Sequence, residues 1–224
     1  MALRKDFPPS ADRINRVQTK RNQSMVKSER IKKESWKPGN VLWPGPVVLV
    51  SCGGTEDWKP NLITIAWAGS VCSDPPMLSI SVRPERHSHS IIQATHEFVV
   101  NIPSPRQAKA VDWCGTVSGR DVDKFAETRL TPAKALKVRC PIIAECLLNI
   151  ECRVQKSLKL GSHTMFVAEV VAVQVSSTLL DSKGRLRVEK GGLLAFAHGQ
   201  YFEIGDRLGH FGFSVRKRPP KTRR

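Results

Sequence analysis

The sequence predicts a mainly β protein in which short antiparallel strands form a small closed or partly closed barrel with a few short helices. Three observations favour this fold class. Short apolar or alternating segments recur between residues 46 and 175, turn residues separate them, and only three short stretches carry helix-start signals. A βαβ nucleotide-binding fold fits poorly, because no G-x-G-x-x-G follows the first strand and no Walker A motif occurs.

Four strands are expected in the first half of the barrel. Residues 46–52 form an apolar run closed by two glycines, and residues 97–102 form a run stopped by a proline. Residues 61–68 and 77–83 alternate, which indicates strands with two different faces. In 61–68 the alternation puts Trp67 on the face of the larger apolar residues, where it is expected to lie in the core.

Two longer strands follow in the second half. Residues 147–158 alternate, so that Asn149 and Glu151 are expected to face outward while their apolar neighbours face inward. Residues 164–175 are apolar on both faces, which is typical of a barrel wall that packs against a helix or another subunit.

Three short helices are expected between these strands. They cover residues 88–95, 105–113 and 121–128, with starts marked by Ser88, by Ser104-Pro105 and by Asp121.

The charge is concentrated at the two ends of the chain. Of the formal net charge of +16, residues 1–37 carry +7 and residues 214–224 carry +6. We expect 1–38 to be a disordered basic extension, 39–213 the globular domain and 214–224 a basic tail, with Met25 as an alternative start. Basic ends can bind nucleic acid or a membrane surface, but most are simply solvated.

Several function classes lack their signatures. No apolar run of membrane-spanning length and no secretory signal is present, and the six cysteines are expected to be reduced, so a cytoplasmic location is expected. No cysteine or histidine spacing suits a metal site, and no G-x-S-x-G motif occurs. Cys114 with a distant histidine would make a nucleophile, but a small buried thiol is more common. No catalytic side chain and no metal ligand is therefore predicted.

The segment from Ser79 to His89 is the first candidate binding site. Ser81 and Arg83 lie on the polar face of a strand, just before a helix start at Ser88. Hydroxyl groups, a guanidinium and helix N–H groups together favour a phosphate. The alternative is a strand edge with a capped helix and solvated charges.

Two further segments are candidates. Thr64, Ala66 and Ala68 form a strand face without bulk, which suits either a flat ligand or close packing in a barrel. Residues 114–125 read as a polar loop before a short helix, and loops on a rigid barrel often hold ligands. In that loop Lys124 would meet a phosphate or pair with Asp121.

Together these segments resemble a known family. WPGPVVLVSCG (43–53), PNLITIAWAGSVCSDPPMLSISVRPERHSHSII (60–92), EFVVNIPS (97–104), VDWCGTVSGRDVDKF (111–125) and CPIIAECLLNIEC (140–152) are similar to the flavin reductase-like family, within it to the flavoredoxin group of FMN-binding split barrels. The resemblance covers about 40–213.

The resemblance implies a six-stranded antiparallel split barrel of Greek-key type, a homodimer, and non-covalent FMN near the subunit interface. It implies contacts from the strand beside the flavin ring, from the phosphate-side strand and loop, from a strand end and from the loop that closes the site. These residues are Asn61, Leu62, Thr64, Ala66, Trp67, Ser81, Arg83, Ser88, His89, Asn101, Ile102, Cys114, Gly115, Ser118 and Lys124.

The resemblance also implies a function. The expected protein is an FMN-dependent oxidoreductase that takes electrons from NAD(P)H or a redox partner and passes them to free flavin, a ferric chelate or a protein acceptor. The alternative is a flavin-binding protein with little turnover, brought by its basic ends to nucleic acid or a membrane surface.

Overall fold

The computed structural model describes residues 31–215 of the chain. The chain divides into two units after residue 40, and residues 31–40 contain no helix or strand. Every element below belongs to residues 41–215. The expectations for residues 1–30 and 216–224 lie outside the described residues.

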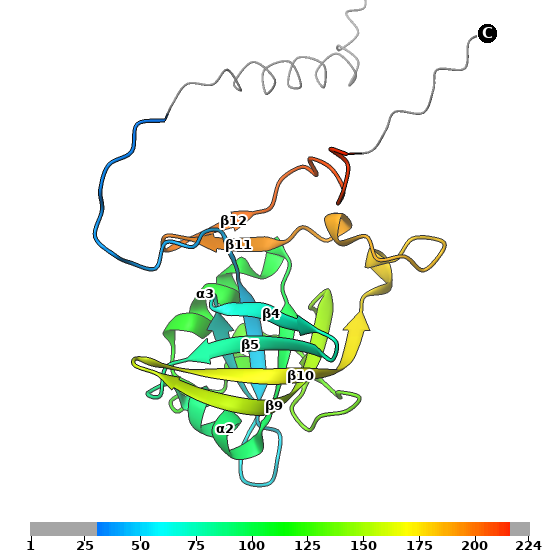
Figure 1. Cartoon of the computed structure of the whole chain (residues 1–224). Helices are drawn as coiled ribbons and strands as arrows, with labels where there is room; N and C mark the ends of the chain where they lie inside the picture. Colours follow the sequence, from blue (N-terminus) through cyan, green and yellow to red (C-terminus); the bar gives the residue numbers. More distant parts are fainter. Residues whose placement is uncertain (1–30, 216–224) are drawn as a thin grey trace, which may run out of the picture. The chain divides into compact units, whose positions relative to one another are not determined.

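Seven strands form the main sheet, and all of their pairings are antiparallel (Figure 1). The strands are β2 (Val48–Cys52), β3 (Asn61–Ile65), β4 (Ala68–Ser73), β5 (Pro76–Val82), β6 (Glu97–Ile102), β9 (Leu148–Leu160) and β10 (His163–Val175). Their order across the sheet is β3-β2-β6-β9-β10-β5-β4. All six strands expected from the sequence are present in this sheet, with ends shifted by at most a few residues.

The expected count of six strands is wrong for this sheet, which has seven and is not closed by pairing of its two edge strands. The extra strand arises because the segment 61–68 is not one strand. β3 ends at Ile65, and after a break at Ala66 and Trp67 the chain continues as β4, which turns back to pair with β5. Hydrogen bonding continues across the break, since Ser81 N donates to Trp67 O at 2.9 Å.

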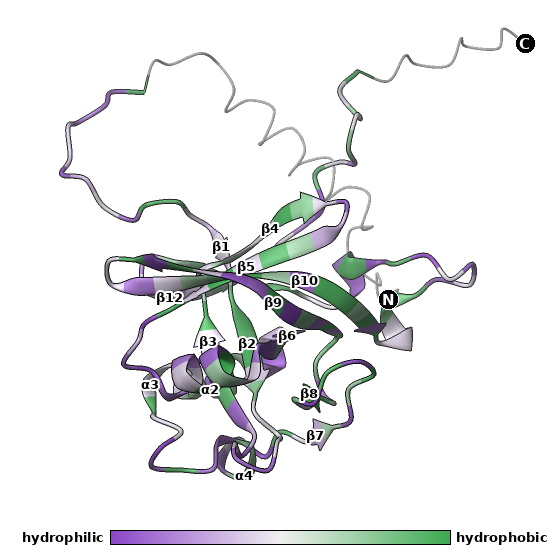
Figure 2. Ribbon diagram, turned by 60° about the horizontal axis from the view of Figure 1, so that its bottom comes forward, coloured by the Kyte–Doolittle hydropathy of each residue, from purple (hydrophilic) through white to green (hydrophobic). Residues whose placement is uncertain are grey.

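The main core lies on one face of this sheet. Apolar side chains that alternate along the strands, such as Val50, Ile80, Phe98 and Phe166, are almost completely buried there. Period-2 alternation produces this result because every second side chain of a strand points to the same face. Figure 2 shows the hydrophobic colouring of β2 and β3 in contrast to the mixed colouring of the helices.

Short helices lie at the turns between strands. They are α2 (His87–Thr95), α3 (Ala108–Thr116), which follows a 3₁₀ turn at Pro105–Gln107, and α4 (Lys124–Thr128). All three were expected, but two starts differ. Arg86 rather than Ser88 is the N-cap of α2, and Asp123 rather than Asp121 caps α4, its carboxylate accepting from Phe125 N and Ala126 N.

The outer face of β9 is covered where the sequence predicted exposure. Asn149 and Glu151 are buried, so the expectation that they face outward is wrong. Glu151 accepts hydrogen bonds from Leu136 N at 2.8 Å and Lys137 N at 2.6 Å. The loop that supplies these amide groups lies against the sheet because the buried carboxylate satisfies its backbone donors.

Small elements complete the described chain. They are the sheet of β1 (Gly45–Pro46), β11 (Leu194–Ala197) and β12 (Gln200–Glu203), the pair β7 (Pro132–Ala133) and β8 (Ile142–Ile143), and 3₁₀ turns at Ser177–Leu179 and Val188–Lys190. Within residues 31–215, no helix has the length and apolarity needed to cross a membrane.

Candidate functional site

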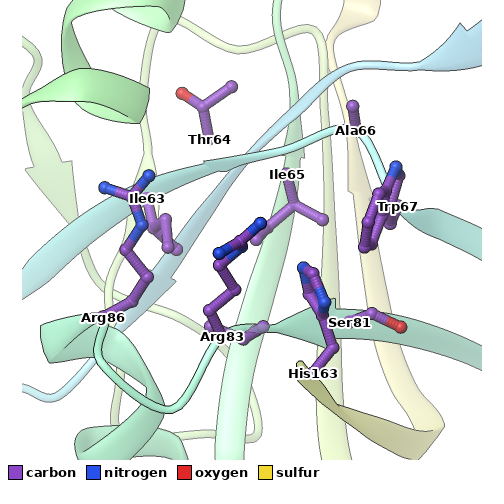
Figure 3. A pocket seen from close by; sticks show the side chains of 10 residues that line it. Ile63, Thr64, Ile65, Ala66, Trp67, Ser81, Arg83, Arg86 and His163 are labelled. Carbon is purple, nitrogen blue, oxygen red and sulfur yellow. The ribbon is translucent and has the colours of Figure 1, made fainter. Parts of the chain in front are cut away.

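A pocket of about 170 Å³ lies between β3, β5 and the turn that joins β9 to β10 (Figure 3). Its lining comes from the end of β3 and the break after it, from the end of β5 and the turn beyond it, and from the start of β10. The lining residues are Ile63, Thr64, Ile65, Ala66, Trp67, Ser81, Val82, Arg83, Arg86 and His163. Five of the residues expected from the sequence therefore meet here: Thr64, Ala66, Trp67, Ser81 and Arg83.

One end of the pocket is aromatic. The rings of Trp67 and His163 lie with their centroids 4.1 Å apart at an interplanar angle of 44°. Trp67 is 45% exposed, so the expectation that it lies in the core is wrong. Its side chain projects to the same side as those of Ile63 and Ile65 (Figure 3), but it lies beyond the end of β3 at the open end of the pocket, where it is exposed. Burial lowers the pKa of His163, and the nearby Arg83 lowers it further.

The other end is cationic. Figure 3 shows the guanidinium groups of Arg83 and Arg86 reaching toward β3 from the turn after β5. Arg83 Nη1 lies 3.4 Å from Glu85 Oε1, and Arg86 forms no ion pair within the described residues. A hydrogen bond from its own backbone amide lowers the pKa of Glu85, and Arg83 and Arg86 add to this effect. The pocket thus has a surplus of positive charge at this end.

The outer side of β3 packs closely on α3. The Thr64 hydroxyl donates to the carbonyl oxygen of Val111, and a Cβ atom on Gly115 would lie 3.2 Å from Thr64 Cβ. Cys114 and Gly115 belong to the last turn of α3, which corrects the expectation that a loop begins at residue 114. Small side chains at this contact let the helix approach the strand beside the pocket.

A buried hydrogen bond connects β3 to the start of α2. Asn61 Nδ2 donates to Ser88 Oγ at 2.8 Å. Gly119, in the loop after α3, lies against the same amide, because a Cβ atom there would be only 2.0 Å from Asn61 Oδ1. Ser118 precedes this glycine, and its hydroxyl accepts from Arg120 N at 3.2 Å. Asn61, Ser88 and Ser118 therefore surround the cationic end without lining the pocket.

Lys124 is buried, with only 4% of its surface exposed. Its ammonium group donates to the carbonyl oxygen of Cys114 at 2.7 Å, rather than pairing with Asp121. Burial lowers the pKa of Lys124, and burial raises the pKa of the Cys114 thiol to about 11. The lysine satisfies a carbonyl in the last turn of α3, where a positive charge also complements the helix dipole.

Four other expected residues lie away from the pocket. Leu62 is buried in the cluster beneath α3, and Ile102 packs on the main core. His89 Nε2 lies 2.9 Å from Thr164 Oγ1 on β10. Asn101 is completely buried, and its amide forms hydrogen bonds with Leu49 O, Ser51 Oγ and Asn149 Nδ2, among others.

Arg86 lies in the first candidate segment of the sequence but was not among the flavin contacts that the resemblance implied, and His163 was not expected in the site. His163 begins β10, about 80 residues after β5, and nothing near it in the sequence indicates chemistry. The pairing of Thr164 with Val82 brings the neighbouring His163 to the pocket. Ile63, Ile65 and Val82 supply the apolar floor and were expected as core residues.

The class of protein to which this antiparallel sheet and its pocket beside β3 and β5 belong follows from a match to a known family. Residues 42–205 match the family described as "Flavin reductase like domain". The chain belongs to the flavin reductase-like family.

Two solved structures and one further protein illustrate this similarity. The flavoredoxin of Desulfovibrio vulgaris (Miyazaki F) is 29% identical, with a TM-score of 0.77 over 83% of this chain and 100% of that one. An FMN-binding protein from Thermus thermophilus is 26% identical, with a TM-score of 0.67 over 81% and 99% of the two chains. The reductase component of 4-nitrophenol 4-monooxygenase/4-nitrocatechol 2-monooxygenase from Rhodococcus opacus is 32% identical over 54% of this chain and 62% of its own.

Proposed function

We propose that this protein binds FMN non-covalently in the pocket between β3 and β5 and acts as an oxidoreductase. It takes electrons from NAD(P)H or a redox partner and passes them to free flavin, a ferric chelate or a protein acceptor. The observation that carries the proposal is the division of one pocket into an aromatic, apolar end and a cationic end. A flat heterocycle that carries a phosphate has the same division.

The residues present fit such a group. Arg83 and Arg86 provide forked donors for a phosphate, and their single paired carboxylate, Glu85, leaves a positive surplus. The start of α2 directly follows Arg86 and adds the positive end of a helix dipole. The side chains of Ile63 and Ile65, which project to the same side of β3 as Trp67 (Figure 3), form an apolar floor on which a ring can lie. Trp67 and His163 would cover the other end.

When bound, the flavin supplies the redox chemistry, because it accepts a hydride and releases electrons singly or in pairs. The protein's own side chains then bind, orient and shield. The Cys114 thiol stays protonated at neutral pH, since burial raises its pKa to about 11. The other buried cysteines have raised pKa values for the same reason. No thiolate nucleophile is part of the proposal.

The similar proteins support both parts of the proposal. One is a flavoredoxin, one is an FMN-binding protein, and one is the reductase component of a monooxygenase.

The first test is an absorption spectrum of the purified protein, followed by anaerobic addition of NADH or NADPH. A flavin spectrum that bleaches with either nucleotide is expected. Absence of flavin, together with no binding of added FMN, would contradict the proposal.

The second test measures the FMN dissociation constant of Arg83→Ala. Loss of a charge-assisted contact costs about 1.5–3 kcal/mol, which weakens binding roughly ten- to a hundred-fold. Arg187→Ala is the matched control, because Arg187 forms a similar i,i+2 ion pair with Glu189 but does not line the pocket. An unchanged constant in Arg83→Ala would remove this arginine from the phosphate end.

A homodimer is part of the same proposal. Trp67, which lines the pocket, is 45% exposed, and Val71, on the edge strand β4, is 51% exposed. Exposed apolar side chains of this kind suit contact with a second copy. Light scattering after size exclusion measures the oligomeric state. A monomer that still binds FMN would contradict the dimer and leave the flavin site standing.

The alternative function is flavin binding with little turnover, directed by the basic ends to nucleic acid or a membrane surface. Oxidation of NAD(P)H by the full chain and by a 25–213 truncation separates the two. The oxidoreductase proposal expects both proteins to retain FMN and turnover.

A further inference from the structure

Three arginines gather around one short turn at the cationic end of the pocket. Arg83 and Arg86 flank Glu85 in the turn between β5 and α2. Arg120 comes from the loop between α3 and α4, and its Nη1 donates to the carbonyl oxygen of Glu85 at 3.0 Å. This bond forms a bridge between two segments that lie 35 residues apart in the sequence.

The loop that carries Arg120 is held against the fold. Gly119 lies so close to Asn61 that a Cβ atom would be 2.0 Å from the amide oxygen, and Asn61 in turn donates to Ser88 Oγ. The backbone N–H of Arg120 donates to Ser118 Oγ at 3.2 Å. These contacts position the base of the Arg120 side chain, although its guanidinium is exposed.

The charge of Arg120 acts at the start of α2. Burial lowers the pKa of His87, the first residue of that helix, and Arg120 and Lys124 lower it further. Arg120 does not itself line the pocket, but its hydrogen bond to Glu85, which stands between Arg83 and Arg86, places it beside the cationic end rather than the end formed by Trp67 and His163.

We infer that Arg120 determines which flavin nucleotide the pocket accepts: it contributes to binding the terminal phosphate of FMN, and its bridge to Glu85 closes the cationic end against the adenylate extension of FAD. This inference rests on the proposed function.

The chemistry of the two nucleotides supports the distinction. A terminal phosphate monoester carries a charge of about −1.5 to −2 and three acceptor oxygens, which suits several forked guanidinium donors. In FAD the same phosphate is a diester, which carries less charge and continues covalently into the adenylate. In the inferred arrangement the bridge between residues 120 and 85 stands beside that phosphate, so that the adenylate is accommodated only when the Arg120 side chain leaves Glu85.

The test compares FMN and FAD dissociation constants, measured by flavin fluorescence quenching on the flavin-free full chain. The variants are Arg120→Ala and Arg120→Lys, with Arg187→Ala as the control. The original protein is expected to prefer FMN at least ten-fold. Arg120→Ala is expected to weaken FMN roughly ten-fold without weakening FAD, the effect of one charge-assisted contact. Arg120→Lys, which keeps the charge but not the fork, is expected to lie between them, and the control to match the original protein.

Two results would overturn the inference while the proposed function stands. One is equal affinity of the original protein for FMN and FAD. The other is an Arg120→Ala variant in which both constants change by the same factor or not at all. If the original protein binds neither nucleotide, the proposed function fails as well. Thermal unfolding checks that the variants fold, and if Arg120→Ala does not, the FMN-to-FAD ratio of Arg120→Lys decides.

Discussion

Replacing Lys124 with methionine separates the charge of this buried lysine from its packing. Methionine keeps a long apolar side chain but removes the hydrogen bond from the ammonium to Cys114 O. That bond is worth about 1.5–3 kcal/mol, whereas removal of a buried charge relieves a desolvation cost of the opposite sign. We therefore expect Lys124→Met to change the free energy of unfolding at pH 7 by less than about 2 kcal/mol. Lys124→Ala, which also leaves a cavity, should cost about 2–5 kcal/mol more.

The lowered pKa of Lys124 predicts how the difference in unfolding free energy between the two proteins changes with pH. Burial lowers the pKa of Lys124 in the folded protein below its ordinary value of 10.5. Between the lowered pKa and 10.5 the unfolded chain binds more protons at this site than the folded chain, so the folded state gains stability as the pH rises. The methionine variant has no such site. The stability of the original protein relative to Lys124→Met should therefore rise through this window and be constant below it.

Urea unfolding of both proteins between pH 7 and pH 10.5 measures the difference, and other titrating groups largely cancel between them. FMN titrations at pH 7 provide a second readout. Since the ammonium adds positive potential near Arg86, both Lys124 variants should bind FMN several-fold more weakly. A stability difference that does not change with pH would refute the account of Lys124 as a buried, charged group. Unchanged FMN affinity would show that Lys124 acts only as the hydrogen-bond donor to Cys114 O in the last turn of α3.

Two further substitutions test the surroundings of the pocket. Gly119→Ala places a Cβ atom 2.0 Å from Asn61 Oδ1, so we expect about 1–3 kcal/mol of destabilisation and weaker FMN binding. Gly205→Ala, with open space around it, should leave both measurements unchanged. Cys114→Ala should retain FMN and most NAD(P)H-dependent turnover, because the thiol has a pKa raised to about 11 and carries no electrons; a variant that keeps FMN but loses turnover in a stopped-flow assay would require a thiol relay.

The strands and helices could be predicted from the sequence because their signals are local. Alternation along β5 and the first part of β9 places apolar side chains on one face, and this face is the core, while β6 was marked by its apolar run. Gly and Pro mark the turns between them. The segment around Arg83 that lines the cationic end of the pocket could also be found, since a polar strand face leading into a helix start lies within a few residues of sequence.

The errors occurred where distant segments decide the outcome. Asn149 and Glu151 look solvent-facing in an alternating strand, but a loop some 14 residues away along the chain covers them and donates its amides to the carboxylate. Trp67 looks like a core residue because alternation is assumed to continue, whereas β3 ends two residues earlier. Periodicity reports the direction of a side chain within one strand and contains no information about what lies opposite or where pairing stops.

The sequence by itself determined the mainly β class, the family resemblance and one half of the pocket, from Thr64 to Arg83. Only the tertiary structure brought His163 to Trp67 and Arg120 to Glu85, because each of these contacts joins segments from different parts of the sheet or its loops. Such contacts depend on the pairing order and register of the whole antiparallel sheet, which no short stretch of sequence encodes.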